Sequence, residues 1–187
     1  AEAGYVAAVP DYYAARAQQP TMEGGTIKGG PTDEQSGRDL EACVRWLACL
    51  PYVDKNRVGT IGWCGGGRQA LFLAGRSRAI RAAASFYGRP INRPNQPKPG
   101  PIDIVASIGC PVFGAYGEDD TAIPVETVRE FEAALHKAGV AHEIHYYAGA
   151  GHAFMNDQRD GYCAPAAKAS WDAVLGFFAH HLGAATA

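Results

Sequence analysis

The sequence predicts an α/β protein with a mostly parallel sheet and helices on both of its faces. Three observations carry this prediction. Short apolar runs alternate with longer amphipathic runs, glycines surround a sharp turn near residue 64, and residues suited to catalysis follow successive strand-like runs. Because parallel strands are joined by crossover connections, each helix-like run fills the space between two strand-like runs.

The first half of the chain gives the order strand, helix, strand, helix. Short apolar or β-branched runs predict strands, long glycine-rich stretches predict loops, and apolar residues at helical spacing predict helices. On this basis we expect a strand at 4–9, a glycine-rich loop at 18–30, a helix at 32–50, a strand at 57–62 and a helix through 68–74.

The second half continues the alternation around a proline-rich connection at 89–101. Proline removes a backbone donor and fixes φ, so this stretch cannot extend either neighbour and is predicted to be a surface loop, with a lid over a pocket as the alternative. The remaining elements are strands at 81–88, 111–116 and 142–148 and helices at 124–138 and 165–182. We expect one domain over residues 1–187, with a site at the carboxyl edge of its sheet.

Gly62-Trp63-Cys64-Gly65-Gly66 has the spacing of a nucleophile elbow, with cysteine at the central position. Glycines on both sides would allow a sharp turn between strand and helix, which would place the thiol at a helix N-terminus. There the helix dipole favours the thiolate, and the N–H of Gly65 can face a developing oxyanion. The alternative is a buried structural cysteine beside a glycine-rich turn.

Two further residues occur in the chain order that α/β-hydrolases use for their triads, which is nucleophile, acid, histidine. Asp119 and Asp120 follow the predicted strand at 111–116, and His152 follows the one at 142–148. Taken singly, a loop aspartate usually caps a helix and a loop histidine is usually solvated. Three matches in the required order favour a catalytic interpretation.

These segments resemble the dienelactone hydrolases, which are cysteine-dependent members of the α/β-hydrolase fold. The resemblance rests on the stretches at 62–67, 116–124 and 147–154, and it extends to 4–13, so it covers essentially the whole chain. In that family the acid stands four residues before the proline, which here selects Asp120. The resemblance implies a Cys64–His152–Asp120 triad, with Phe154, at the end of the matched stretch 147–154, as a substrate-binding residue. Tyr87 lies at the end of the predicted buried strand at 81–88, near the site, so we expect it to line the mouth of the pocket and contact substrate.

The chain also departs from the family pattern at several positions. Its start matches the end of the family's first helix, so we expect an N-terminally truncated α/β-hydrolase fold without the preceding strands, the second oxyanion loop and a glutamate that contacts the resting thiol. One substrate-binding arginine is displaced to Arg16, and a second is replaced by Asn156. A substrate carboxylate would lose a bidentate partner at position 156.

Composition excludes several other classes of protein. The net charge is −2 and the basic residues are scattered, so nucleic acid is not an expected partner. No apolar run is long enough to span a membrane, and we expect a soluble, cytoplasmic protein. The five cysteines lack metal-ligand spacing, so neither disulfides nor a metal is expected, and no cofactor is implied. Cys163 is expected to be the main competitor for alkylation.

The sequence therefore predicts a hydrolase of small esters or lactones that forms a thioester on Cys64. A rival prediction is a noncatalytic or thiol-redox protein on the same scaffold. A third is a fragment whose sheet is completed by another chain, which would self-associate through an exposed sheet edge.

Overall fold

A computed structural model describes residues 3–11, 21–23, 26–28, 31–94 and 99–183. Its centre is a parallel sheet with the strand order β3-β4-β5-β6. The four strands are β3 (Val58–Trp63), β4 (Ile80–Phe86), β5 (Val112–Gly117) and β6 (His142–Tyr147). Sequential strands are neighbours from β3 to β6, so the predicted alternation of strands and helices is confirmed over this part of the chain.

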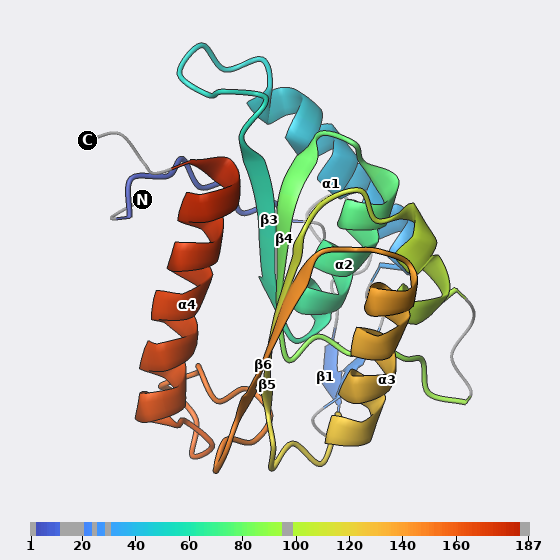
Figure 1. Ribbon diagram of the computed structural model, residues 1–187, viewed down its shortest axis with the longest axis vertical. Coiled ribbons are helices and arrows are strands. Elements are labelled where there is room, and N and C mark those ends of the chain that lie inside the picture. The colour runs from blue at the N-terminus through green and yellow to red at the C-terminus, as the bar shows by residue number, and fades with distance from the viewer. Residues whose placement is uncertain (1–2, 12–20, 24–25, 29–30, 95–98, 184–187) are drawn as a thin grey trace.

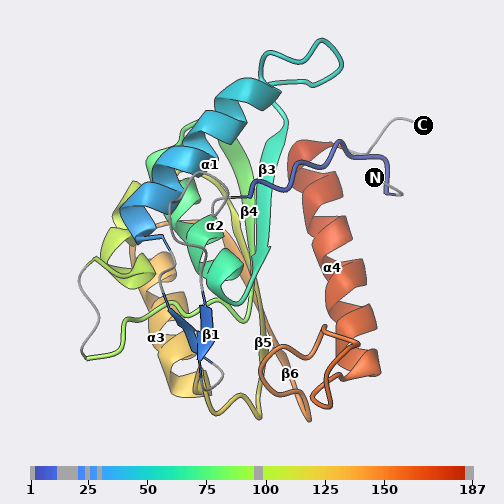
Figure 2. The ribbon, with the colours of Figure 1, turned by 180° about the vertical axis from the view of Figure 1, so that it is seen from behind.

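Helices cover both faces of this sheet (Figures 1 and 2). One face carries α1 (Asp33–Leu47), α2 (Gly65–Arg76) and α3 (Val125–Lys137), and the other carries α4 (Ala164–Leu182). Strand burial follows from this covering: all six residues of β5 are buried, whereas β6 at the edge is half-buried or exposed. The sheet therefore has a separate apolar core on each face.

Local sequence signals account for most helix boundaries. α1 begins after a capping box in which Thr32 accepts from the Gln35 N–H and Gln35 accepts from the Thr32 N–H. It ends at Leu47, three residues before the predicted end. α4 begins one residue before Pro165, so the proline lies in the first turn, where its missing N–H breaks no helical hydrogen bond. A short 3₁₀ helix, Pro101–Ser107, was not predicted.

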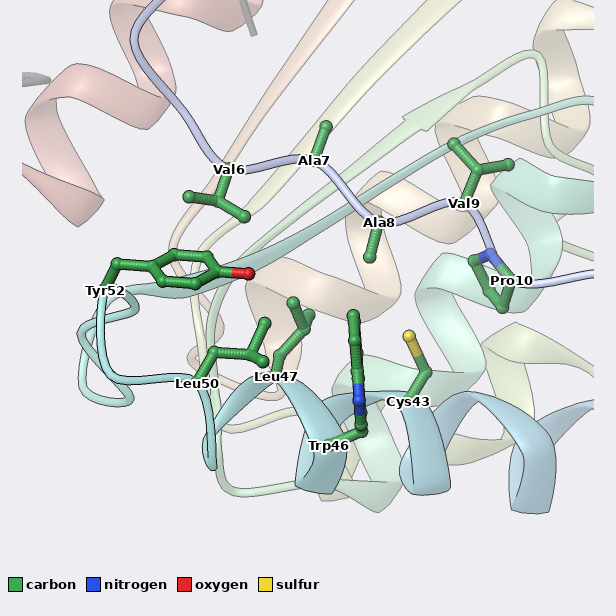
Figure 3. Close-up of a pocket in the computed structure, with 10 residues that line it drawn as sticks. All are labelled: Val6, Ala7, Ala8, Val9, Pro10, Cys43, Trp46, Leu47, Leu50 and Tyr52. Atoms are coloured by element: carbon green, nitrogen blue, oxygen red, sulfur yellow. The ribbon is translucent and has the colours of Figure 1, made fainter.

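The predicted strand at 4–9 is absent. These residues pair with no described strand, and Val9 is 94% exposed. Residues 6–10 instead face α1 across a groove of about 330 Å³, which is lined on the helix side by Cys43, Trp46, Leu47, Leu50 and Tyr52 (Figure 3). An apolar run becomes a strand only where a neighbouring strand accepts its hydrogen bonds. Among the described strands, β3 pairs with β4 alone.

The predicted loop at 18–30 contains a small hairpin. β1 (Thr21–Glu23) and β2 (Thr26–Lys28) pair antiparallel, with Thr21 opposite Lys28 and Glu23 opposite Thr26. The sequence held a signal for it, because Gly24-Gly25 separates the two runs by two residues, as in tight hairpins.

The proline-rich connection is irregular over its described part, residues 89–94 and 99–100, as predicted, although Pro90 is buried. Its alternative role as a lid stays a prediction, since residues 95–98 lie outside the described ranges. Within the described part of the chain, no helix combines the length and apolarity that crossing a membrane requires.

Candidate active site

The turn between β3 and α2 has the shape of a nucleophile elbow. Cys64 adopts φ 53° and ψ −117°, a conformation that non-glycine residues rarely take. A Cβ added at Gly62 would lie 2.1 Å from the carbonyl oxygen of Gly66, so only glycine fits there. The backbone thus doubles back tightly around Cys64, which is exposed.

The glycines after Cys64 have different roles from those expected. At Gly65 and Gly66 an added Cβ would meet nothing within 4 Å, so a glycine on the helix side of the turn is not sterically required at those positions. At Gly67 it would lie 2.9 Å from Ser85 Oγ and 3.0 Å from Gly88 Cα. Gly67 therefore lets α2 pack closely against the end of β4.

A polar anchor that sequence analysis missed holds the start of α2. Arg68 donates to both oxygens of Asp33, with Nη2 at 2.8 Å from Oδ2, and Gln69 Nε2 lies 2.6 Å from Asp33 Oδ1. All but about a tenth of the Arg68 side chain is buried. The N-terminal turns of α1 and α2 are thereby tied together, four residues after Cys64.

Asp120 lies in the loop after β5 and is 3% exposed. Its Oδ1 accepts from the backbone N–H groups of Ala122 at 2.8 Å and Ile123 at 2.9 Å, and its Oδ2 lies 2.8 Å from His152 Nδ1. Its neighbour Asp119 is exposed. The structure therefore brings Asp120, the residue selected from the sequence, to the histidine.

His152 lies between this carboxylate and the thiol. Its Nε2 is 3.2 Å from Cys64 Sγ, and its side chain is 32% exposed. An unbroken chain of hydrogen bonds thus joins Cys64, His152 and Asp120, which come from three loops at the carboxyl edge of the sheet.

The electrostatics of these groups favour charge separation between sulfur and imidazole. The hydrogen bond from His152 is the main cause that lowers the pKa of the Cys64 thiol, against an opposing effect of burial, and the Gly65 N–H lowers it further. The hydrogen bond to Asp120, followed by the one to Cys64, raises the pKa of His152 to about 9. Both directions favour a thiolate–imidazolium pair at neutral pH. The first turn of α2 carries no acidic residue, which suits an anion at that end.

Backbone strain is concentrated at this site. In the part of the chain that the structure describes, the non-glycine residues with positive φ are Cys64 (53°), Tyr87 (38°) and Ala153 (62°). Cys64 carries the thiol, Tyr87 contacts the imidazole, and Ala153 directly follows His152. Each such conformation costs on the order of 1–3 kcal/mol, and such residues cluster at functional sites.

The remaining predicted site residues have different positions. The Tyr87 ring meets the His152 ring edge-on, with centroids 5.3 Å apart, and burial raises its hydroxyl pKa to about 12. Phe154 is fully buried and packs against Tyr87 and Tyr147, behind the rim of the site. Arg16 lies outside the described residues.

The cysteines other than Cys64 differ in accessibility from the prediction. Cys163 is half-buried at the start of α4, whereas Cys49 is exposed just after α1. Cys49 is therefore the better competitor for alkylation. Among the described residues, no cluster of His, Cys, Asp or Glu could hold a metal ion.

Comparison with known proteins identifies the group to which this scaffold belongs. The model of the dienelactone hydrolase family matches residues 1–182. The chain belongs to the dienelactone hydrolase family. Members of this family are hydrolases of lactone or ester bonds on an α/β-hydrolase fold.

Individual relatives agree with this membership. A carboxymethylenebutenolidase-like protein of Salmonella typhimurium is 36% identical over 188 residues, covering 96% of this chain and 68% of its own length. A Bradyrhizobium protein named for lactonase activity on 2-oxo-3-(5-oxofuran-2-ylidene)propanoate is 33% identical over 192 residues, covering 97% of this chain and 75% of its own. The crystal structure of a dienelactone hydrolase-like protein from Klebsiella pneumoniae has a TM-score of 0.73 and 36% identity, covering 79% of this chain and 61% of that one. The chain thus spans roughly two thirds of the length of such relatives.

Proposed function

We propose that this dienelactone hydrolase family member hydrolyses small esters or lactones through a thioester on Cys64. The thiolate attacks the carbonyl carbon, and the resulting oxyanion accepts a hydrogen bond from Gly65 N–H. The carbon–oxygen bond then breaks, and the leaving oxygen takes a proton from the His152 imidazolium. Neutral His152 next removes a proton from water, which attacks the thioester and releases the acid. The thiolate–imidazolium pair is thereby restored, while Asp120 keeps His152 oriented.

The hydrogen-bonded chain from Cys64 Sγ through His152 to Asp120 is the observation that carries this proposal. A structural cysteine needs neither the strained elbow conformation nor a histidine oriented by a buried carboxylate. The opposite directions in which the pKa values of Cys64 and His152 move are those that a nucleophile and its acid–base partner require.

We expect the substrates to be esters or lactones whose leaving oxygen departs readily. We do not expect them to carry a carboxylate that depends on an ion pair near position 156. Asn156 Oδ1 accepts from the Gln158 N–H at 3.0 Å, so this side chain stabilises its own turn. A neutral amide there cannot form the bidentate ion pair of an arginine. Tyr87 is expected to border the acyl group, and Phe154 to support Tyr87 from behind.

Hydrolysis of p-nitrophenyl acetate by the parent and by Cys64→Ala tests this function, with mass spectrometry to locate an acyl adduct. We expect turnover by the parent, an adduct on Cys64, and no turnover by Cys64→Ala above that of buffer. Cys49→Ala and Cys163→Ala serve as matched controls and should retain parent activity. Equal losses in all three variants would refute Cys64 as the nucleophile.

The rival predictions give different results in the same experiments. A binding or thiol-redox protein would leave p-nitrophenyl acetate intact while Cys64 still reacts with iodoacetamide. Self-association through β3, which pairs with β4 alone among the described strands, predicts a dimer in light scattering. A monodisperse monomer would exclude that assembly.

A further inference from the structure

Arg89 is a half-buried arginine that sequence analysis assigned only to the start of the proline-rich connection. It follows β4, whose neighbour in the sheet is the parallel strand β5. The loops after these two strands therefore leave the same edge of the sheet. Arg89 bridges them, because its Nη2 donates a hydrogen bond to the backbone carbonyl of Ala122.

Ala122 is also one of the two residues whose backbone N–H groups hold the Asp120 carboxylate. Its N–H donates to Asp120 Oδ1 at 2.8 Å, while the other carboxylate oxygen lies 2.8 Å from His152 Nδ1. Arg89 therefore binds the carbonyl of the same residue whose amide binds Asp120. The bonded chain runs without a gap from Arg89 through Ala122, Asp120 and His152 to Cys64.

The charges around Arg89 are consistent with a role at the site. Burial is the main cause that lowers the pKa of Arg89, and repulsion from the positive charges of Arg93 and Arg68 lowers it further. Asp120 and Cys64 act in the opposite direction and favour the guanidinium. The site thus favours the Arg89 cation electrostatically, against the effects of burial and of two like charges.

We infer that Arg89 is a positioning residue, which holds the Ala122 peptide and through it keeps the Asp120 carboxylate aligned with His152. The inference rests on the proposed function, since it assigns Arg89 a task in that same site. Without this bond the loop after β5 keeps its own turn but loses the hydrogen bond that joins its Ala122 carbonyl to the segment after β4. Misplacing a catalytic group by about 1 Å can cost on the order of a hundredfold in rate.

The test compares Arg89→Met, Arg89→Lys and the control Arg81→Met, which removes an exposed arginine near the opposite end of β4. Two properties are measured: the kinetics of p-nitrophenyl acetate hydrolysis, and the pH profile of Cys64 alkylation by iodoacetamide. For Arg89→Met we expect kcat to fall about tenfold to a hundredfold with KM within about twofold of the parent. The midpoint of alkylation should rise by about one pH unit, because a less well held Asp120 stabilises the imidazolium less.

Arg89→Lys retains a cationic donor and should recover most of the lost kcat, and Arg81→Met should match the parent in both measurements. Kinetics and an alkylation midpoint of Arg89→Met that match those of Arg81→Met would overturn the inference. Should Arg89→Met fail to fold, Arg89→Ala, which also removes the donor, takes its place with the same expected shift. Failure of the proposed function is distinguishable, because an inert parent leaves the alkylation profile as an independent measure of Arg89.

Discussion

Replacing Asp120 by asparagine separates the orientation of His152 from the folding of its loop. The asparagine would keep a side-chain oxygen that can accept hydrogen bonds from the N–H groups of Ala122 and Ile123. In the parent, Asp120 Oδ1 accepts these bonds at 2.8 and 2.9 Å. Its amide NH₂ would then face His152 Nδ1, which is 2.8 Å from Oδ2 in the parent. Because an amide donates where the carboxylate accepted, neutral His152 would place its proton on Nε2, toward Cys64.

The structure sets the size of the expected effect. The pKa of His152 is raised from its ordinary value near 6.5 to about 9, mainly by Asp120. That rise of roughly 2.5 is worth about 3 kcal/mol. Cys64 contributes part of this rise and the His152 side chain is 32% exposed to screening solvent, so we discount the share due to Asp120 to about 2 kcal/mol. This corresponds to roughly thirtyfold in stabilisation of the imidazolium. The wrong tautomer adds a further loss, so kcat should fall by between about 10² and 10⁴.

The assay is p-nitrophenyl acetate turnover by Asp120→Asn and by the matched control Asp119→Asn, together with a thermal unfolding curve for each. Asp119 is exposed and its N–H is held by the Ala150 carbonyl, so its side chain should be dispensable. We expect the control to retain parent turnover and both variants to unfold near the parent temperature. A larger loss in Asp119→Asn than in Asp120→Asn would refute the reasoning and move the acid by one position.

Two further predictions concern the elbow and its charge. Gly62→Ala should abolish activity and destabilise the fold, because the added Cβ would lie 2.1 Å from the Gly66 carbonyl oxygen. An added Cβ at Gly66 meets open space, so Gly66→Ala should unfold like the parent when followed by circular dichroism. Because the pKa of Cys64 is lowered, its thiolate persists at pH values where an ordinary thiol is already protonated. The thiolate is lost only as pH falls through that lowered pKa. Iodoacetamide at pH 7 should therefore alkylate Cys64 at least about tenfold faster than the exposed Cys49, and His152→Ala should remove this difference; equal rates in the parent would contradict it.

The sequence predicted the parts of the fold that local patterns determine. β5 is buried throughout and β4 is buried except at Arg81, and the elbow glycines mark a sharp turn between strand and helix. Chain order then pointed to the loop with Asp119 and Asp120 and to His152, because parallel strands bring their following loops to one edge. The family resemblance selected Asp120 from the two carboxylates. Local pattern and global topology agree at these positions, and the structure places Asp120 beside His152; the catalytic roles of both residues stay predictions.

Prediction failed where the outcome depends on partners distant in sequence. Residues 4–9 have the composition of a strand, yet no described strand accepts their hydrogen bonds. Arg68 and Arg89 look like ordinary surface cations in the sequence, and only folding brings them to Asp33 and Ala122. Phe154 lies close enough to His152 in sequence to suggest a pocket residue, and the structure buries its ring fully in the core.

The coupled pKa values of Cys64 and His152 constrain which bonds this site could cleave. The lowered pKa of Cys64 and the raised pKa of His152 both favour the ionised pair, so attack by a Cys64 thiolate would require no prior proton transfer. The same stabilisation makes the imidazolium, with a pKa of about 9, a weak acid toward the leaving group. An amide nitrogen needs strong protonation to depart, whereas the enol oxygen of an unsaturated lactone departs readily. Activated esters and lactones should therefore be turned over far faster than a matched amide such as p-nitroacetanilide.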